Sequence, residues 1–401
     1  MTILRIVFKS LRQHALSTSV TAASIALAGG LLMAVWVVKS ESQKTFTGVT
    51  GGFDAVLGAR SSQLQLVLNS IFHLESSPGN LANADYLDLK KDARVALAVP
   101  IAVGDNYRGY RLVGTSLEML KDVEFSAGRK FTVQKPGRLF DPNLREAVIG
   151  SFAAKRLGLN YGDSFQPYHG IIFDEKSQHA ETYVVVGILE PSNTPADRVL
   201  WIPLDGLQKM GGHDPRTASD VSAVLVKLRS PIAGKQLDSL YNKQGNRLTF
   251  AWPIAQIIAQ LFDKISWMDR VLALVAYLVA LVATGSVLAS IYNSMNERRR
   301  EIAILRALGA RRGTIFSAVV LESAAISAIG MAVAFVIYGA IITAVAAVIR
   351  AQTGVVIDPL TMHPVLLLAP AGMIALGAVA GIVPAWKAYR TDVAENLVPA
   401  S

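Results

Sequence analysis

The sequence predicts a membrane protein with four transmembrane α-helices and a large α+β extracytoplasmic domain between the first and the second helix. Four segments are apolar over the roughly 20 residues that a helix needs to cross a bilayer. The segment 39–270, between the first two spans, is long enough to fold around a core of its own. Lysine and arginine gather on one side of all four spans, so the predicted topology is self-consistent.

The overall composition supports a membrane location and argues against nucleic-acid binding, disulfides and thiolate metal sites. Hydrophobic residues make up 52% of the chain and charged residues only 17%, against about 25% charged in a soluble domain. The 39 basic and 30 acidic residues give a net charge of +9. Much of that excess lies beside apolar segments, so we expect membrane lipid around the chain and no nucleic-acid partner. Without cysteine, the chain has no disulfide and no thiolate metal site.

The N-terminal residues 1–15 carry Arg5, Lys9 and Arg12 and are expected in the cytoplasm. Span one covers 16–38. A signal peptide is the alternative, with Ala26 and Ala28 as a weak cleavage pattern, but the apolar run continues well past Ala28.

Residues 39–270 are expected to form the extracytoplasmic domain. Strands are predicted where β-branched and apolar residues run together, at 95–103, 110–113, 183–189, 199–202 and 221–228, with a turn at 104–106. Helical patterns occupy 61–72, 85–92, 152–157 and 204–209. Because predicted strands and helices mix without a regular βαβ alternation, the domain is expected to be α+β. Helical spacing from 253 runs into span two, 271–292, so the first part of that helix is expected to be a stalk, with 39–46 as a counterpart.

The loop 293–313 is strongly basic and is therefore expected in the cytoplasm. Ile302, Leu305 and Leu308 form an apolar stripe at helical spacing. Ser294 and Glu297 have capping-box spacing for a new helix, and Gly309 suits a C-terminal cap. The loop is thus expected to be a short amphipathic helix that docks on a partner; a retention signal with a solvated charge run is the alternative.

Span three covers 314–349, a short outer loop covers 350–363, span four covers 364–386, and the basic tail 387–401 returns to the cytoplasm. Glu322 lies inside span three. An ionisable group at that depth is a functional candidate, and the alternative is a hydrogen bond between helices at a subunit interface. Small residues in spans one, two and four allow close helix packing and suggest oligomerisation.

The chain lacks the sequence motifs of an enzyme. It contains no GxxxxGK[ST] phosphate loop, no HExxH and no GxSxG. His169, Asp174 and His179 lie in one polar loop, where solvated residues are expected in preference to a weak metal site, so we assign no metal ligand and no catalytic residue.

The stretch 297–330, ERRREIAILRALGARRGTIFSAVVLESAAISAIG, resembles the membrane segment of the FtsX/MacB family of ABC transporter permeases, the mechanotransmission or type VII class. The ending Gly381-Ile-Val-Pro384-Ala385-Trp-Lys is similar to that of the family, and segments 146–165 and 183–204 look like its periplasmic domain. The order of one span, a large outer domain and three spans also matches.

The resemblance implies that the chain is the permease subunit and that a separate cytoplasmic ABC ATPase, in two copies, binds and hydrolyses ATP with Mg, so this chain is no enzyme and binds no cofactor. A second permease copy is implied, giving a homodimer, as are a periplasmic protein partner and the bacterial inner membrane, with both termini in the cytoplasm. By position, the ATPase-coupling helix comprises Glu297, Arg298, Arg300, Glu301, Ile302, Leu305, Arg306, Leu308 and Gly309.

The expected function is to couple ATP hydrolysis to movement of the periplasmic domain, for export or periplasmic extraction of a substrate. A second hypothesis is transmembrane signalling, in which the outer domain activates a periplasmic partner such as a cell-wall hydrolase. A stand-alone membrane enzyme is a third, disfavoured by the absence of paired acid/base or metal motifs.

Overall fold

The computed structural model describes residues 3–212, 218–297, 299–358 and 361–390. At 296–297, 299–301, 388 and 390 it describes the backbone without the side chains. The chain divides into two compact units. The first, here called the bundle, takes residues up to 41, 265–347 and those from 358 onward. The second, here called the sheet domain, takes 42–264 and 348–357.

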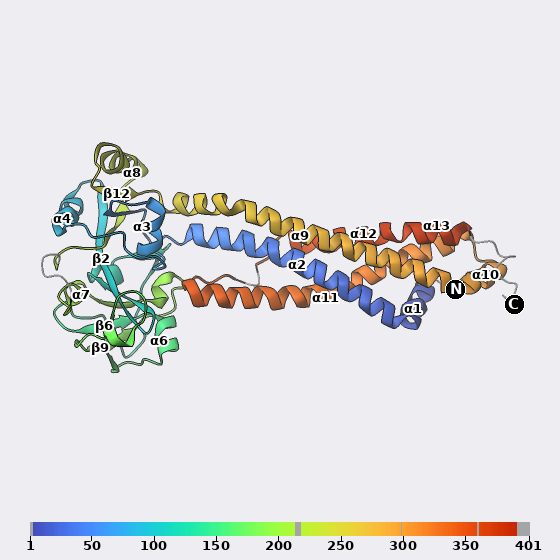
Figure 1. The fold of residues 1–401 in the computed structure, drawn as a ribbon, viewed down its shortest axis with the longest axis horizontal. Coiled ribbons are helices and arrows are strands. Elements are labelled where there is room, and N and C mark those ends of the chain that lie inside the picture. Colours follow the sequence, from blue (N-terminus) through green and yellow to red (C-terminus); the bar gives the residue numbers. More distant parts are fainter. Residues whose placement is uncertain (1–2, 213–217, 298, 359–360, 391–401) are drawn as a thin grey trace. The chain divides into compact units, whose positions relative to one another are not determined.

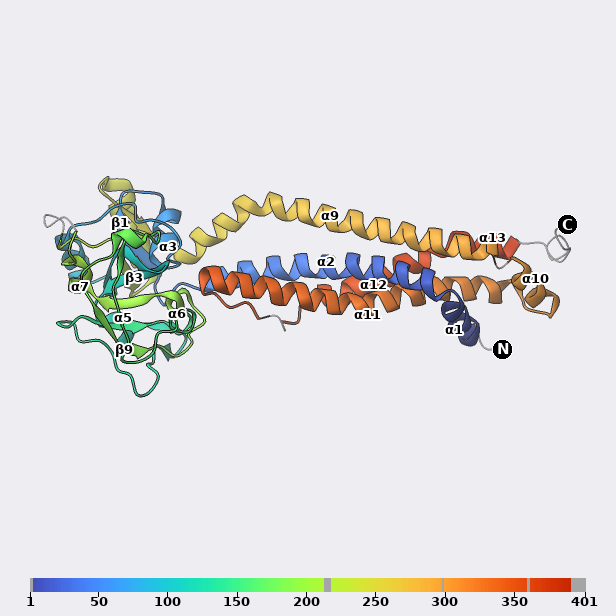
Figure 2. The same cartoon turned by 60° about the horizontal axis from the view of Figure 1, so that its bottom comes forward.

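Long helices dominate the bundle (Figures 1 and 2). Within the described residues, four helical stretches are long and apolar enough to cross a membrane, which confirms the predicted four-helix class. The span bounds predicted from sequence stay a prediction, because the helices extend beyond them. The helices are α1 (Ile3–Gln13), α2 (Ala15–Gly48), α9 (Ile254–Glu297), α10 (Arg299–Ala307), α11 (Arg312–Thr353), α12 (Val365–Ala380) and α13 (Ile382–Arg390).

The fourth membrane stretch is interrupted at Gly381, between α12 and α13. Pro384 has no N–H to donate to the carbonyl of Ala380, four residues earlier, so one rung of the helical ladder is missing there. The chain nevertheless continues in the same sense, because the Ala385 N–H donates to the Gly381 carbonyl at 3.0 Å.

Some glycines of the bundle pack against neighbouring helices of the same chain. A Cβ on Gly30 of α2 would lie 2.8 Å from Ile337 Cγ2 of α11. A Cβ on Gly377 of α12 would overlap the hydroxyl of Ser327 on α11. Gly30 and Gly377 are therefore explained by packing within the chain, whereas Gly285 and Gly372 have nothing within 4 Å of an added Cβ. The predicted oligomer stays a prediction.

The sheet domain is built on a mixed sheet in the order β12-β1-β11-β2-β3-β10-β6-β9-β7, with β8 paired to β2. Only the β10–β3 and β6–β9 pairs of this sheet are parallel among the described residues. The strands are β1 (Ala55–Ala59), β2 (Val95–Tyr107), β3 (Tyr110–Thr115), β6 (Glu146–Ile149), β7 (Ser164–Phe165), β8 (Tyr168–His169), β9 (Tyr183–Ile188), β10 (Leu200–Pro203), β11 (Ala223–Leu228) and β12 (Leu248–Ala251), and a separate pair is β4 (Glu124–Ser126) with β5 (Arg129–Lys130).

Short helices complete the domain and confirm the α+β class. They are α3 (Gln63–Ser70), α4 (Asn83–Lys91), α5 (Glu118–Lys121), α6 (Ser151–Leu157), α7 (Leu204–Gln208) and α8 (Pro231–Asp238), with one-turn helices η1 (Glu175–Ser177) and η2 (Pro195–Arg198) and the π-helix η4 (Ser239–Gln244). The five predicted strands and four predicted helices all fall on observed elements, whereas β1, β6, β12 and α8 were not predicted.

The turn predicted at 104–106 is wrong. Strand β2 continues through these residues to Tyr107, with a bulge between Val103 and Asp105, and the hairpin turns at Arg108 and Gly109 instead. Both of those residues have positive φ, +48° and +84°, as a two-residue hairpin turn requires. Asp105 consequently lies within the sheet and is fully buried, at 0% exposure.

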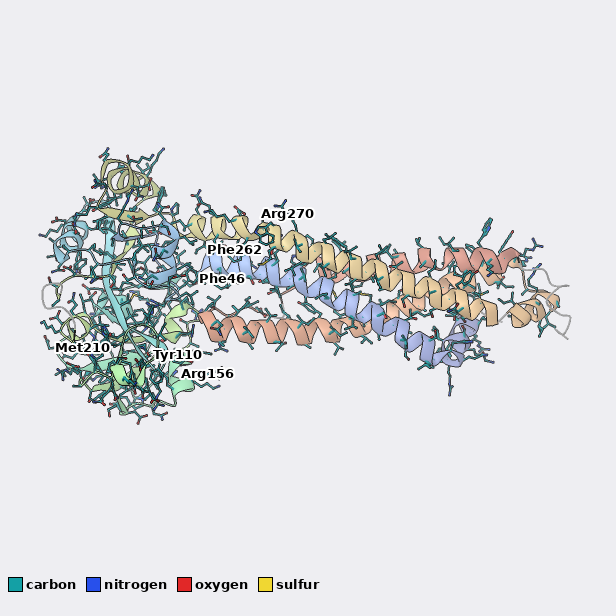
Figure 3. The ribbon with its side chains drawn as sticks, in the orientation of Figure 1. Phe46, Tyr110, Arg156, Met210, Phe262 and Arg270 are labelled. Atoms are coloured by element: carbon teal, nitrogen blue, oxygen red, sulfur yellow. The ribbon has the colours of Figure 1, made fainter. Side chains whose placement is uncertain are left out.

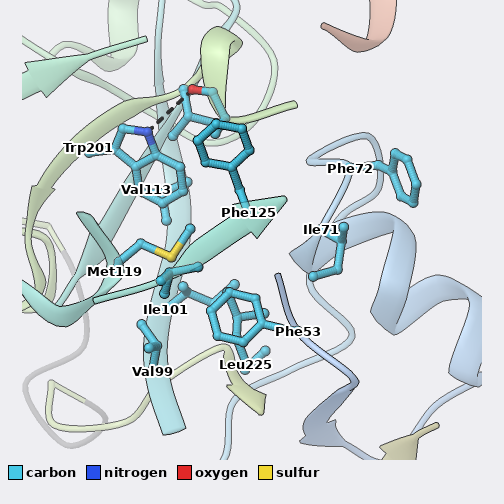
Figure 4. Close-up of a cluster of buried hydrophobic side chains, with 14 of the residues drawn as sticks. Phe53, Ile71, Phe72, Val99, Ile101, Val113, Met119, Phe125, Trp201 and Leu225 are labelled. Atoms are coloured by element: carbon cyan, nitrogen blue, oxygen red, sulfur yellow. Dashed lines mark hydrogen bonds between the residues drawn. The ribbon is translucent and has the colours of Figure 1, made fainter. Parts of the chain in front are cut away.

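The sheet domain has buried clusters on both faces of its sheet. Leu57 and Ile202 belong to the clusters of one face, and the largest cluster lies on the other face. Phe53, Ile101, Val113 and Trp201 gather there, and the Trp201 indole N–H donates to the Ala196 carbonyl at 3.4 Å (Figure 4). Phe46, near the end of α2, packs against this core through Phe72 at 5.6 Å and Phe262 of α9 at 6.1 Å between ring centroids (Figure 3). The C-terminal end of α2 and the N-terminal end of α9 are therefore part of the sheet domain.

Candidate functional site

The short helix α10 lies in the loop that the sequence assigned to a partner ATPase. Its C-terminus has the predicted glycine cap: Gly309 has φ +96°, its N–H donates to the Arg306 carbonyl at 3.0 Å, and the Ala310 N–H donates to the Leu305 carbonyl at 3.0 Å. These two bonds are the Schellman pattern, which ends a helix at a residue in the left-handed conformation. The cap predicted at Gly309 is confirmed.

The start of α10 differs from the prediction. Ser294 lies inside α9, which continues to Glu297, so it does not cap a new helix. The apolar face of α9 continues past Ser294, and Met295 is buried among the helices of the bundle. This packing stabilises the helical conformation beyond the capping-box pattern.

The apolar side chains at 302–308 are divided between two environments. Ile302 and Ala303 are buried, at 6% and 0% exposure, and Ile302 belongs to the apolar core of the bundle. Ile304 and Leu308, four residues apart, are exposed at 44% and 80%. Side chains four apart share one helix face, so these two form an apolar surface on the outside of α10.

The other predicted residues of the coupling helix are placed as follows. Leu305 and Arg306 are half-buried, and Gly309 is exposed. The side chains of Glu297, Arg300 and Glu301, and all of Arg298, lie outside the described residues. Their assignment stays a prediction.

Behind α10 the bundle has a partly open cavity of about 220 Å³. Ile302 and Leu305 of α10, Ser10 and Lys9 of α1, and Glu322 of α11 contribute to its wall. The lining residues are mostly apolar.

Glu322 is buried within the bundle, at 7% exposure, and accepts a hydrogen bond from the Ser10 hydroxyl of α1. This contact is within one chain, unlike the subunit-interface bond considered from the sequence. Helix α1 and Ser10 were not predicted, although Ile3, Ile6, Val7 and Ser10 already have helical spacing in the basic N-terminus.

The polar loop of the sheet domain is arranged differently from the predicted trio. His169 and His179 do come together, with ring centroids 5.5 Å apart. Asp174 instead caps η1, where its carboxylate accepts from the Lys176 N–H at 3.0 Å. The acid beside the two histidines is Asp105.

Comparison with known proteins decides the family. Residues 18–239 match the model of the MacB-like periplasmic core domain, and residues 273–393 match that of the FtsX-like permease C-terminal domain. The chain belongs to the FtsX/MacB family of permeases. The matched FtsX-like region contains α10 and Glu322, and the family is the permease component of ABC systems, whose ATPase is a separate subunit. The chain is thus an ABC-type permease subunit and a multi-pass membrane protein.

Two solved structures resemble this FtsX/MacB permease. One is the periplasmic region of MacB from Actinobacillus actinomycetemcomitans, 16% identical, covering 54% of this chain and 94% of that chain with a TM-score of 0.36. The other is the extracellular domain of the noncanonic ABC-type transporter YknZ from Gram-positive bacteria, 19% identical, covering 49% and 97% with a TM-score of 0.31. No curated protein matches the chain.

Proposed function

We propose that this permease binds a separate cytoplasmic ATPase through the exposed face of α10 and converts ATP hydrolysis into movement of its sheet domain. The observation that carries the proposal is the exposed pair Ile304 and Leu308 on a short, capped helix inside the FtsX-like region. An amphipathic helix with anchors four residues apart is a common way to occupy a hydrophobic groove on a partner.

The inner face of α10 supports a coupling role. Ile302 and Ala303 are buried, so a push on the outer face is passed to side chains of the bundle core. The link from Gly309 to the start of α11 at Arg312 is short. Displacement of α10 is therefore expected to move α11 directly, as a small shift at an effector site moves packed helices.

The lengths of the helices support transmission away from the membrane. Helices α2 and α9 have 34 and 44 residues, or about 50 and 65 Å at 1.5 Å per residue, against a hydrocarbon core of about 30 Å. Both helices contribute residues to the bundle and to the sheet domain. A continuous helix carries a displacement at one end to the other without a hinge.

Basic residues indicate the proposed orientation and place. Arg5, Lys9 and Arg12 before span one, and the arginines around α10, favour a cytoplasmic side for the N-terminus and α10. The sheet domain is then periplasmic, and the chain works in the inner membrane as one of two permease copies with two ATPase copies. We propose that this movement exports a substrate or extracts it from the periplasm. If the purified complex instead activated a periplasmic enzyme without transport, signalling would be favoured.

Co-purification of the chain with its ATPase tests the docking face. Leu308→Asp is expected to lose the ATPase while the permease stays folded, because Leu308 is 80% exposed. The matched control is Leu144→Asp, at an exposed leucine of the sheet domain, which should retain the ATPase. Retention of the ATPase by Leu308→Asp and by Ile304→Asp would overturn the proposal.

A further inference from the structure

We propose that Asp105, His169 and His179 of the sheet domain form a binding site for Zn²⁺. Each residue offers one ligand atom, and the three atoms all lie within 4.8 Å of one another. None of the three residues belongs to α10, so this proposal does not depend on the proposed coupling to an ATPase.

The backbone brings these residues together by strand pairing. Strand β8 pairs with β2 so that His169 lies opposite Asp105. The chain then returns: Gln178 forms a bridge with Tyr168, and the His179 N–H donates to the Pro167 carbonyl at 2.8 Å. The ligand set therefore comes from three adjacent, hydrogen-bonded segments.

Further hydrogen bonds hold the loop between the two histidines. The Asn106 side-chain amide donates to the Gly170 carbonyl at 2.8 Å, and the Ser177 hydroxyl donates to the His169 carbonyl at 3.2 Å. Asn106 is buried, at 1% exposure. The loop is thus anchored to β2 directly beside Asp105, which limits how far the ligands can separate.

The distances suit a tetrahedral metal ion. His169 Nδ1 lies 3.2 Å and His179 Nε2 lies 3.4 Å from the same oxygen, Asp105 Oδ1. In a tetrahedron with metal–ligand bonds of about 2.0–2.1 Å, neighbouring ligand atoms are about 3.3 Å apart. The remaining His169–His179 pair can close by a small rotation, because the side chain of His169 is 55% exposed.

The ligand chemistry selects the metal. Two imidazole nitrogens and one carboxylate oxygen are typical of Zn²⁺, whereas Ca²⁺ and Mg²⁺ prefer oxygen ligands alone. Asp105 is fully buried, at 0% exposure, and a buried carboxylate is costly unless a positive charge accompanies it. A Zn²⁺ ion held by the three ligands would supply that charge.

Three protein ligands leave one coordination position for a ligand from outside the chain. Binding would also tie the loop 170–178 to the central strand β2 at both of its ends. The site is therefore expected to stiffen this part of the sheet domain.

The test is calorimetric titration of Zn²⁺ into the full-length chain, solubilised in detergent, treated with a chelator and purified without a histidine tag. The expected result is saturable binding of one Zn²⁺ per chain. His169→Ala removes an exposed ligand, so the fold should survive while the affinity falls by more than the roughly 10–100-fold typical of losing an outer-shell partner.

Two controls make the result specific. Asp174→Asn, in the same loop, should bind Zn²⁺ like the wild type, because Asp174 caps η1 instead of facing the histidines. Co²⁺ in place of Zn²⁺ should give the visible absorption of a tetrahedral site, and His169→Ala should abolish it. The proposal is overturned if the wild type shows no saturable binding, since the cluster is then an ion pair only, or if His169→Ala binds as tightly as the wild type.

Discussion

The hydroxyl of Ser10, on α1, donates a hydrogen bond to the carboxylate of Glu322, on α11, across 312 positions of sequence. Both residues are buried, at 7% exposure each. The bond joins the N-terminal helix to the third membrane stretch at the wall of the cavity behind α10. Helix α1 is thereby part of the packing that surrounds the coupling helix.

We predict that Ser10→Ala lowers the thermal stability of the full chain. A buried hydrogen bond to a carboxylate is lost, and such a bond contributes about 1.5–3 kcal/mol to stability. Glu322→Ala should cost at least as much, and Glu322→Gln less, because its amide oxygen still accepts. The measurement is the unfolding midpoint in lipid nanodiscs.

Ser24→Ala is the matched control for that series. Ser24 also lies on a bundle helix, but its hydroxyl is exposed and bonds only to the Val20 carbonyl of its own helix. Its loss is expected to change stability by less than about 0.5 kcal/mol. Equal midpoints for Ser10→Ala and Ser24→Ala would contradict the role given to the Ser10–Glu322 bond.

Gly377→Val is predicted to destabilise the packing of α12 on α11. A Cβ at this position would overlap the Ser327 hydroxyl, which itself donates to the Ser323 carbonyl at 3.1 Å. Overpacking of this kind costs about 1–3 kcal/mol. Gly372→Val, on the same helix with nothing within 4 Å of its Cβ, is the control and should be close to neutral by the same unfolding assay.

A rescue separates steric overlap from a general effect of valine. Gly377→Ala should be destabilising by itself and less so when combined with Ser327→Gly, which removes the hydroxyl that the new methyl group meets. If the two changes add without any rescue, the close approach of α11 and α12 at this point is not the cause.

His73 predicts a loss of stability in acid. It is held with positive φ, +55°, beside Trp201, with ring centroids 5.8 Å apart. Burial, and then the charges of Arg111 and Arg198, lower the pKa of His73 from 6.5 to about 3, while the nearby Asn69 backbone opposes them. Part of the residue is exposed, but its Nδ1 atom is buried.

The sign follows from the proton balance. Below pH 6.5 the unfolded chain binds a proton at His73, whereas the folded chain binds it only near pH 3. The free energy of unfolding therefore falls as the pH drops from 6.5 towards 3. Between pH 7.5 and 5 the loss is about 2 kcal/mol for this one group. His73→Asn removes the titration and tolerates positive φ, so its unfolding midpoint should depend less on pH than that of the wild type. Parallel pH profiles for the two proteins would refute this account.

The sequence predicts elements whose signal is local and continuous. The apolar spans, the helix from 253 onward and the cap at Gly309 each depend on residues within one segment, and the structure has all of them. The Ser294 capping pattern failed because tertiary packing of the apolar face of α9 outweighed a local preference.

Contacts between distant segments could not be predicted from one sequence. Ser10 meets Glu322 only because α1 folds against α11, and no local pattern encodes that pairing. Asp105 was assigned to a turn because Gly104 precedes it, whereas a bulge at this glycine lets β2 continue and buries the carboxylate beside two histidines. The burial of Ile302, opposite the exposed Leu308, likewise depends on how α10 packs on the bundle.

The absence of cysteine permits a direct test of the coupling face. Leu308→Cys would carry the only thiol of the chain, and a short thiol-reactive crosslinker can report whether that position touches the ATPase in the assembled complex. We predict crosslinking from Leu308→Cys and Ile304→Cys, and none from Leu144→Cys on the sheet domain. An intact complex that crosslinks from neither Leu308→Cys nor Ile304→Cys would show that the ATPase docks elsewhere.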